Sequence, residues 1–310
     1  MLPHQPMKVK VVPNKLPASF SALPELLRSE KIYRIQLATI PGIGPITFQK
    51  LIETYGSAEI ALKDHNFKNK NTKSIKTIEE NLVQTQKYGA HTLIWGDKHY
   101  PRYLYELSDA PPVLYVKGDL KLLHKQIFGV VGARNASITG TKITTHLSEG
   151  LGNSGYIVAS GLARGIDAAA HQASLDTGTI ACIAGGLDMP YPPENIDLFN
   201  KIIKKGVIIT EMPLGTQPQA RHFPRRNRLI AGLSIGIVVI EAAKKSGSLI
   251  TAKLAADYGR DVFAVPGSPL DPRSYGTNQL IKDGAVLTRN IEDILEAQPS
   301  FEANQLYITD

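Results

Sequence analysis

The sequence has almost no cysteine and no long apolar run. Its 310 residues include one cysteine, Cys182, which excludes an intrachain disulfide and a cluster of thiolate metal ligands. No apolar stretch approaches the roughly 18 residues of a membrane-spanning helix, and prolines interrupt the N-terminus where a signal peptide needs an apolar core. The histidines lack the spacing or the cysteine partners of a zinc site. These absences predict a protein of the reducing cytoplasm with no metal centre and no membrane segment.

Acidic residues are fewer than basic residues, and most of the difference lies in the first ninety residues. The sequence holds 35 lysines and arginines against 28 aspartates and glutamates, a formal net charge of +7, which favours an anionic partner. Residues 1–90 hold 13 basic and 7 acidic residues, whereas residues 91–310 hold 22 and 21. The larger part of the chain is therefore nearly neutral, and an anion site within it has to come from local clusters of basic side chains.

The first ninety residues predict a proline-rich tail, 1–24, and a helical domain, 25–90. Apolar residues recur with helical spacing over Leu26–Thr39. The run PGIG at 41–44 separates this helix from a second one. That pattern is typical of a helix-hairpin-helix whose exposed amides bind a phosphate, although a plain helical turn explains it equally well. Residues 63–76 are polar and basic, as expected of a solvated loop, with contact to nucleic acid as the alternative.

Residues 91–297 are predicted to form one α/β domain, and residues 298–310 a polar tail. Short β-branched runs alternate with helical stretches, which indicates a doubly wound, mainly parallel sheet. The runs are apolar throughout, as in strands covered on both faces. The predicted strands are Ile127–Val131, Tyr156–Ala159, Thr179–Ala184, Val207–Thr210, Ile235–Ile240 and Val262–Val265, and the predicted helices are Gly140–Leu151, Ile166–Leu175, Asn195–Lys204 and Leu249–Tyr258.

The loops after the strands are the candidate site, because ligands of open parallel sheets bind beyond the carboxyl ends of the strands. The first loop, GARNAS, lacks the G-x-G-x-x-G spacing of dinucleotide sites, and the chain has no G-x-x-x-x-G-K-[ST] motif. Its arginine and serine can still offer donors to an anion. In the second loop, Ser160 and Arg164 are predicted to face the ligand. Asp167 and His171, four residues apart, can form an acid–base pair or a pair that locks the loop.

The loop after the third predicted strand contains a glycine pair and three prolines, which favour a rigid turn. Within it, Tyr191 can stack on a nucleobase or pack in the core, and Asp188 is expected to orient the loop rather than to catalyse. Each of these loops is a weak signal alone. Because all of them follow strands of one predicted sheet, together they indicate a single edge that binds a polyanion or a nucleotide.

The segment His222–Arg228 is the densest basic cluster. Three arginines beside Phe223 suit a phosphate backbone with stacked bases. The alternative is that one or two of them are buried in ion pairs, for instance with Glu211 or Glu241, and at least one such pair is expected. After the fifth strand, Ser248 is predicted to cap the next helix. The complete set of predicted phosphate-binding residues is Gly132, Arg134, Ser137, Ser160, Gly161, Arg164, Gly165, Arg225, Arg226, Arg228, Lys244, Lys245, Ser246, Gly247, Ser248 and Gly267.

Six of these segments resemble, in order, the motifs of the DNA-processing protein A (DprA/Smf) family: GARNAS, SGLARGIDAAAH, GGLDMPYPPEN, HFPRRNRLIAGLS, EAAKKSGSLITAKLA and VPGS. The resemblance covers about residues 30–297. It implies an extended Rossmann-like fold, N-terminal helices resembling a SAM-like domain, and single-stranded DNA as the ligand. It further implies a homodimer that protects single-stranded DNA and helps to load the RecA recombinase in natural transformation, with no catalytic residues and no cofactor.

The resemblance also implies which residues form the family's positively charged pocket. They are Gly132, Arg134, Ser160, Arg164, Arg225, Arg226, Arg228, Lys244, Lys245, Ser246 and Ser248. Two features depart from the family pattern. The familiar G-S-R is G-A-R here, which removes one hydroxyl and keeps the arginine. The C-terminal winged helix of many members has no counterpart after residue 297, so its role is not expected in this chain.

An enzyme is the alternative function. Rossmann-like phosphoribohydrolases of the LOG type also bind nucleotide phosphates on glycine-rich loops after strands. They usually carry a P-G-G-x-G-T-x-x-E run, of which this sequence has only the fragment Pro266-Gly267-Ser268. The balance of motifs therefore favours a binding protein over a nucleotide hydrolase. A pure interaction scaffold leaves the basic loops unexplained.

Overall fold

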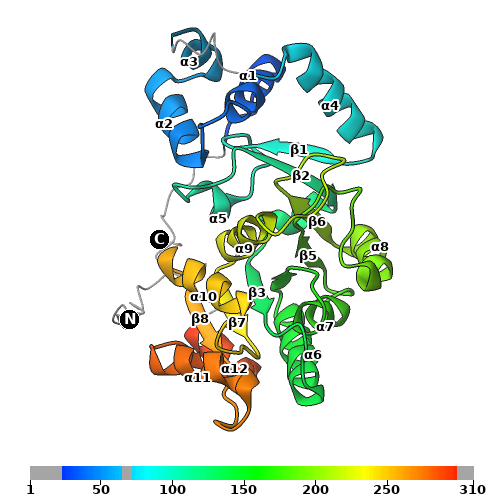
Figure 1. Ribbon diagram of the computed structural model, residues 1–310, viewed down its shortest axis with the longest axis vertical. Helices are drawn as coiled ribbons and strands as arrows, with labels where there is room; N and C mark the ends of the chain where they lie inside the picture. The colour runs from blue at the N-terminus through cyan, green and yellow to red at the C-terminus, as the bar shows by residue number, and fades with distance from the viewer. Residues whose placement is uncertain (1–22, 65–71, 299–310) are drawn as a thin grey trace, which may run out of the picture.

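The computed structural model describes residues 23–64 and 72–298. The two predicted tails and the predicted loop at 63–76 therefore lie largely or partly outside the described residues. Within them, one nine-stranded sheet forms the body of the molecule, with helices on both faces (Figure 1). The predicted α/β class, with a doubly wound and mainly parallel sheet behind a small helical part, is confirmed.

Within the described residues, four helices precede the sheet. The turn after the first of them contains Gly42, whose φ of +87° favours glycine, and Pro45 begins the second helix at the position where a missing N–H costs least. Phe48 packs edge-on against Trp95 with ring centroids 6.3 Å apart, so the helical part shares its core with the sheet-bearing part. The helices are α1 (Arg28–Ala38), α2 (Pro45–Tyr55), α3 (Ala58–Asp64) and α4 (Ile75–Lys87).

The sheet has the strand order β1-β2-β6-β5-β4-β3-β7-β8-β9. The six predicted strands are its parallel strands β3 to β8, with ends that differ by at most two residues from the prediction. The sequence analysis did not predict β1 and β2, which are antiparallel, or the short β9. The strands are β1 (His91–Ile94), β2 (Val113–Gly118), β3 (Ile127–Val131), β4 (Ile157–Ser160), β5 (Thr179–Cys182), β6 (Val207–Thr210), β7 (Gly236–Val239), β8 (Asp261–Ala264) and β9 (Val286–Leu287).

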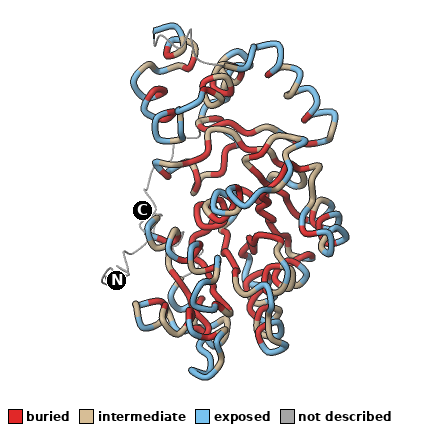
Figure 2. The backbone as a smooth tube through the Cα atoms, in the orientation of Figure 1, coloured by how far each residue is buried: buried red, intermediate tan, exposed pale blue. Residues whose placement is uncertain are grey.

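Alternate residues of each strand feed two different cores, because successive side chains of a strand point to opposite faces. Ile127 and Val131 of β3 pack with α9, whereas Phe128 and Val130 pack with α6 and α7. Figure 2 shows the buried backbone concentrated along these central strands. The helices of this part are α5 (Arg102–Tyr105), α6 (Ile138–Asn153), α7 (Ile166–Ala173), α8 (Ile196–Lys205), α9 (His222–Leu233), α10 (Gly247–Asp257), α11 (Tyr275–Lys282) and α12 (Ile291–Ala297).

The winding direction of the sheet reverses at β3. From β3 the chain adds β4, β5 and β6 on one side, and it then returns to place β7 on the other side of β3. The loops after β3 and β7 therefore diverge, and in open α/β sheets the ligand crevice lies at such a point. None of the helices in the described residues is long and apolar enough to cross a membrane.

Candidate functional site

A hollow of about 500 Å³ opens at this reversal point. The loops after β3, β4 and β7 form its sides together with α9 and the first turn of α10. This arrangement confirms that the strand-end loops lie along one edge of the sheet. The hollow is lined by Val131, Gly132, Arg134, Ala163, Asp167, Ala220, Phe223, Pro224, Arg226, Asn227, Ile230, Ser246, Gly247, Ser248, Ile250 and Thr251.

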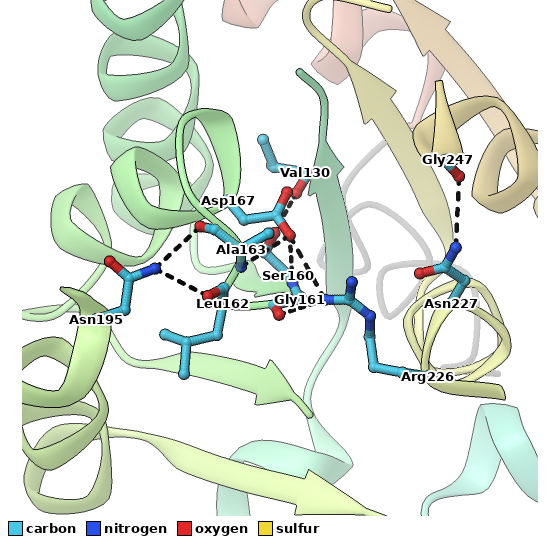
Figure 3. A network of polar contacts seen from close by, with 10 residues as sticks. All are labelled: Val130, Ser160, Gly161, Leu162, Ala163, Asp167, Asn195, Arg226, Asn227 and Gly247. Carbon is cyan, nitrogen blue, oxygen red and sulfur yellow. Dashed lines mark hydrogen bonds and ion pairs between the residues drawn. The ribbon is translucent and has the colours of Figure 1, made fainter. Parts of the chain in front are cut away.

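Arg226 and Asp167 form the floor of the hollow. The Arg226 guanidinium donates to the Gly161 carbonyl and lies 3.6 Å from the Asp167 carboxylate (Figure 3). That carboxylate also accepts the amides of Gly161 and Ala163, at 3.2 and 3.3 Å. Burial raises the pKa of Asp167 and lowers the pKa of Arg226, while the attraction between the two charges opposes both shifts. The ion pair thus holds the β4–α7 loop against α9.

The glycines of this loop are explained by its own packing. A side chain at Gly161 would collide with the Arg226 guanidinium. Gly165 has a φ of +72°, and a Cβ there would lie 2.7 Å from the Arg134 carbonyl oxygen. The amide of Gly161 is already bonded to Asp167. Both glycines therefore shape the loop, and their predicted contact with a phosphate stays a prediction.

The three arginines of α9 have three different environments. Arg225 is exposed and forms no salt bridge with any described residue. Arg226 is buried in the floor. Arg228 donates to both carboxylate oxygens of Glu211 at 2.9 Å and lies 3.5 Å from the Asp109 carboxylate. The expectation of at least one buried pair is confirmed, with Glu211 as a partner, and of the three arginines only Arg225 is exposed.

Glu241 pairs with Ser137 and not with an arginine. The Ser137 hydroxyl donates to one carboxylate oxygen at 2.5 Å and its amide to the other at 3.0 Å. The same hydroxyl oxygen accepts the Gly140 amide at 2.8 Å and caps α6. The prediction that Ser137 offers donors to a ligand is wrong, because an anion of the chain itself occupies this helix N-terminus.

Ser160 was predicted to face the ligand, and this is wrong. It is the last residue of β4, it is fully buried, and its hydroxyl donates to the Val130 carbonyl at 2.6 Å. The predicted pairing of Asp167 with His171 is also wrong. His171 shares a hydrogen bond of 2.8 Å with the Thr179 hydroxyl, and burial lowers the pKa of His171 to about 3.

The mouth of the hollow carries exposed cations and aromatic rings. The guanidinium of Arg134 lies 5.6 Å from the centre of the Phe223 ring. Tyr191 is about half exposed and meets Phe223 edge-on at 6.1 Å, so it is not a core residue. Arg164 is exposed and pairs with Glu194 at 3.3 Å, a surface contact of small energy that a phosphate can replace. Cations and stacking surfaces therefore meet at the mouth.

The loop after β7 forms the opposite side of the mouth. Ser246, not Ser248, caps α10, which begins at Gly247, two residues before the predicted start. The hydroxyls of Ser246 and Ser248 are 2.7 Å apart. Lys244 and Lys245 are exposed just outside the hollow, and the Lys244 ammonium lies 5.5 Å from the Tyr275 ring centre.

The remaining predicted residues differ in whether they line the hollow. Gly132 lines it, whereas Gly267 lies in the loop after β8 and bonds its amide and carbonyl to the Asn278 side chain. Asp188 orients its loop as expected, since its carboxylate accepts the Gly215 amide at 2.9 Å. The sequence analysis missed Asn227, whose only signal was its place between two arginines.

The walls of the hollow are more apolar than its mouth. Val131, Ile230 and Ile250 face it, with Phe223 and Pro224 at one side, and a charged phosphate would lose its hydration there without full compensation. A planar base has an apolar face that such walls can cover. The geometry therefore suits a ligand with a base inside and phosphates at the mouth. Among the described residues, no three side chains group as metal ligands.

Comparisons with known proteins agree on one family. The family model described as DNA recombination-mediator protein A matches residues 91–299, and the model described as DprA-like N-terminal HHH domain matches residues 28–65. The DNA processing protein DprA of Bacillus subtilis is 43% identical over 221 residues, which cover 70% of this chain and 74% of the relative.

Two solved structures show the same fold. The X-ray structure of DNA processing protein A from Streptococcus pneumoniae superposes with a TM-score of 0.75 and 34% identity, over 89% of this chain and 99% of that one. The structure of DNA processing protein A from Helicobacter pylori, a study of its single-stranded DNA binding mode, has a TM-score of 0.62 and 31% identity, over 67% and 94% of the two chains.

Proposed function

Because this chain belongs to the DNA recombination-mediator protein A family, which includes the DNA-processing proteins DprA and Smf, we propose that it binds single-stranded DNA at the hollow beside β3. One base enters the hollow, and the flanking phosphates contact exposed cations at its mouth. Those cations are Arg134, Arg164, Lys244 and Lys245, and Arg225 is exposed on the neighbouring side of α9, towards Glu211.

The observation that carries this proposal is the separation of charge from apolar surface. Arg134 is exposed, while the walls behind it are aliphatic and aromatic. Stacking and phosphate contacts of this kind give binding with little sequence preference. The single-stranded DNA binding mode studied for the Helicobacter pylori protein is consistent with this ligand.

The titratable groups behind the hollow support binding rather than catalysis. Burial holds His171 neutral with a pKa of about 3 and raises the pKa of the Cys182 thiol to about 12. A general base or nucleophile needs a pKa nearer to neutrality and access to the substrate. Asp167 is already bonded to two amides and an arginine. His171 and Asp167 have structural partners and Cys182 is fully buried, so we propose a binding protein and not a nucleotide hydrolase.

The decisive experiment measures the binding of labelled oligo-dT of increasing length at several salt concentrations. We expect affinity to rise with length and to fall with salt by a log–log slope of about −0.7 per phosphate contacted. Arg134→Ala and Arg225→Ala should each weaken binding and flatten that slope, whereas Arg28→Ala, an exposed arginine on α1, should not. If oligo-dT binds no better than dTMP, the proposal fails and nucleotide hydrolysis becomes the function to test.

We further propose that the chain acts as a homodimer that protects single-stranded DNA and helps to load RecA. The family's description as a recombination mediator supports this role. Light scattering tests the dimer, and nuclease digestion of bound oligonucleotide tests protection. RecA assembly on single-stranded DNA in the presence and absence of the protein tests loading. An unchanged rate of RecA assembly would contradict the loading role without affecting the DNA-binding proposal.

A further inference from the structure

A second group of exposed cations lies at the opposite edge of the sheet, where the parallel strands begin. We call it the lysine edge. Its members come from the segment after β2 and from the last two turns of α8, and all of them are exposed. The lysine edge consists of Lys121, Lys125, Lys201, Lys204 and Lys205.

Backbone pairing brings the two segments together. Strand β2 is antiparallel to β6, with Gly118 opposite Val207. The next residue, Asp119, donates its amide to the Gly206 carbonyl at 2.9 Å. The short 3-10 helix η2 (Leu120–His124) begins there, directly beside the C-terminal end of α8. The lysine edge is therefore fixed by the sheet and does not depend on a mobile loop.

Local charge is far from balanced at the lysine edge. The segments 119–125 and 201–205 hold five lysines and one acidic residue, Asp119, although residues 91–310 as a whole are nearly neutral. Asp119 accepts the backbone amide of Lys121 at 3.0 Å. Lys205 pairs with Asp176 at 2.6 Å, and because that aspartate is 89% exposed the pair adds little stability.

The helix dipole explains part of this cluster but not all of it. Lys204 and Lys205 lie in the last turn of α8, where positive charge is favourable. Lys121 and Lys125 are not in an α-helix, so that explanation does not apply to them. A cluster of like charges costs repulsion, which a bound polyanion would remove.

The chemistry of the lysine edge fits a phosphate backbone better than a protein partner. Protein interfaces are depleted in lysine and enriched in aromatic residues at their centre. None of the exposed large hydrophobic side chains of the described residues belongs to η2 or to the second half of α8. Lysine ammoniums are flexible point charges without a fixed fork, which suits sequence-independent contact with phosphates.

We propose that the lysine edge is a second contact for the backbone of the same single strand whose base enters the hollow. This inference rests on the proposed function. The two sites lie at opposite ends of the parallel strands, and β5 alone, with four residues, spans about 13 Å. This is the shortest possible separation, and the DNA has to pass around the helices that cover the strands, so contact with both sites requires a longer strand than the one that fills the hollow.

The test compares two lengths of oligo-dT on the full chain. One has about six nucleotides, within the roughly 4–16 that one module covers, and the other has about thirty. The triple variant Lys121→Gln, Lys204→Gln, Lys205→Gln removes three charges from the lysine edge. A matched variant, Lys87→Gln, Lys142→Gln, Lys282→Gln, removes three charges from exposed lysines on other helices. Thermal unfolding of both variants checks that each remains folded.

We expect the lysine-edge variant to bind the short oligonucleotide as the wild type does. For the long one, its affinity should fall at least about tenfold at 0.1 M salt, and its salt slope should flatten by about 2, since about 0.7 is lost per phosphate contact. The matched variant should change neither quantity to this extent. If the two variants bind the long oligonucleotide with the same affinity and the same salt slope, the proposed role of the lysine edge is overturned and the proposed function is not. Failure of the wild type to bind either oligonucleotide would overturn the proposed function and this inference with it.

Discussion

The floor and the mouth of the hollow both use arginine, and they use it in opposite ways. At the floor, Arg226 is 7% exposed and bound to Asp167 and a backbone carbonyl. At the mouth, Arg134 is exposed and has no salt bridge with a described residue, and Arg225, the sequence neighbour of Arg226, is likewise exposed but lies on another side of α9. A helix turns by about 100° per residue, so the side chains of adjacent arginines lie on different sides of α9, one buried and one exposed. Basic residues in one motif therefore need not share one role.

The largest effect predicted by this comparison is on stability. Arg226→Ala leaves Asp167 charged and buried without its partner, and breaking a buried pair in this way costs about 3–5 kcal/mol. Urea unfolding measures the free energy of unfolding. Arg225→Ala is the control, since an exposed substitution away from such contacts changes it by about 0.5 kcal/mol or less. Equal losses of unfolding free energy in Arg226→Ala and Arg225→Ala would mean that the two arginines contribute equally to stability.

The second prediction concerns pH and the buried histidine behind the floor. Burial, aided by the charge of Arg226, lowers the pKa of His171 to about 3 in the folded chain, against about 6.5 when unfolded. Below pH 6.5 the unfolded chain binds a proton that the folded chain does not. The free energy of unfolding therefore falls with decreasing pH, by up to about 1.4 kcal/mol per pH unit.

Urea unfolding between pH 7 and 5 measures this loss before most carboxylates titrate. His171→Gln removes the proton-binding group, so its free energy of unfolding should fall less steeply over the same window. His124, whose pKa burial also lowers, remains in both proteins and cancels in the difference. Parallel pH profiles of the two proteins would show that His171 is not the group responsible.

The sequence could predict the features that depend on local patterns, and it could not predict those that depend on tertiary contacts. Six strands and the edge that carries the site follow from local patterns, because apolar runs and glycine-rich loops are local signals. Strands β1 and β2 escaped prediction because their antiparallel pairing, of β1 with β2 and of β2 with β6, is set by tertiary contacts and not by a local pattern. The sequence analysis found the arginines and named Glu211 as a possible partner, but it did not find the pairing of Arg226 with Asp167, which is far away along the chain.

Polar residues at strand ends were the least predictable part of the site. Ser137 and Ser160 have the composition of ligand-binding loops, yet both hydroxyls are bonded within the protein, to Glu241 and to the Val130 carbonyl. A serine after a strand can serve a ligand or the backbone equally well, and only the three-dimensional positions of acceptors decide between the two. Arg134 and Arg225 are exposed and have no salt bridge with a described residue, and their predicted contact with a phosphate stays a prediction.

The smallest predicted effect separates the charge of Arg225 from the geometry of its guanidinium. Arg225→Lys keeps the positive charge and loses the planar fork that contacts a phosphate through two N–H groups. We expect the affinity for oligo-dT to fall a few-fold, or about 1 kcal/mol, with an unchanged salt slope. Arg225→Ala should instead flatten the slope by about 0.7, because one phosphate contact is lost. If Arg225→Lys flattens the salt slope as much as Arg225→Ala does, a positive charge at this position is not enough, and the contact requires the guanidinium. An unchanged affinity in both variants would mean that Arg225 does not contact DNA. The phosphates would then contact only the other exposed cations, those around Arg134.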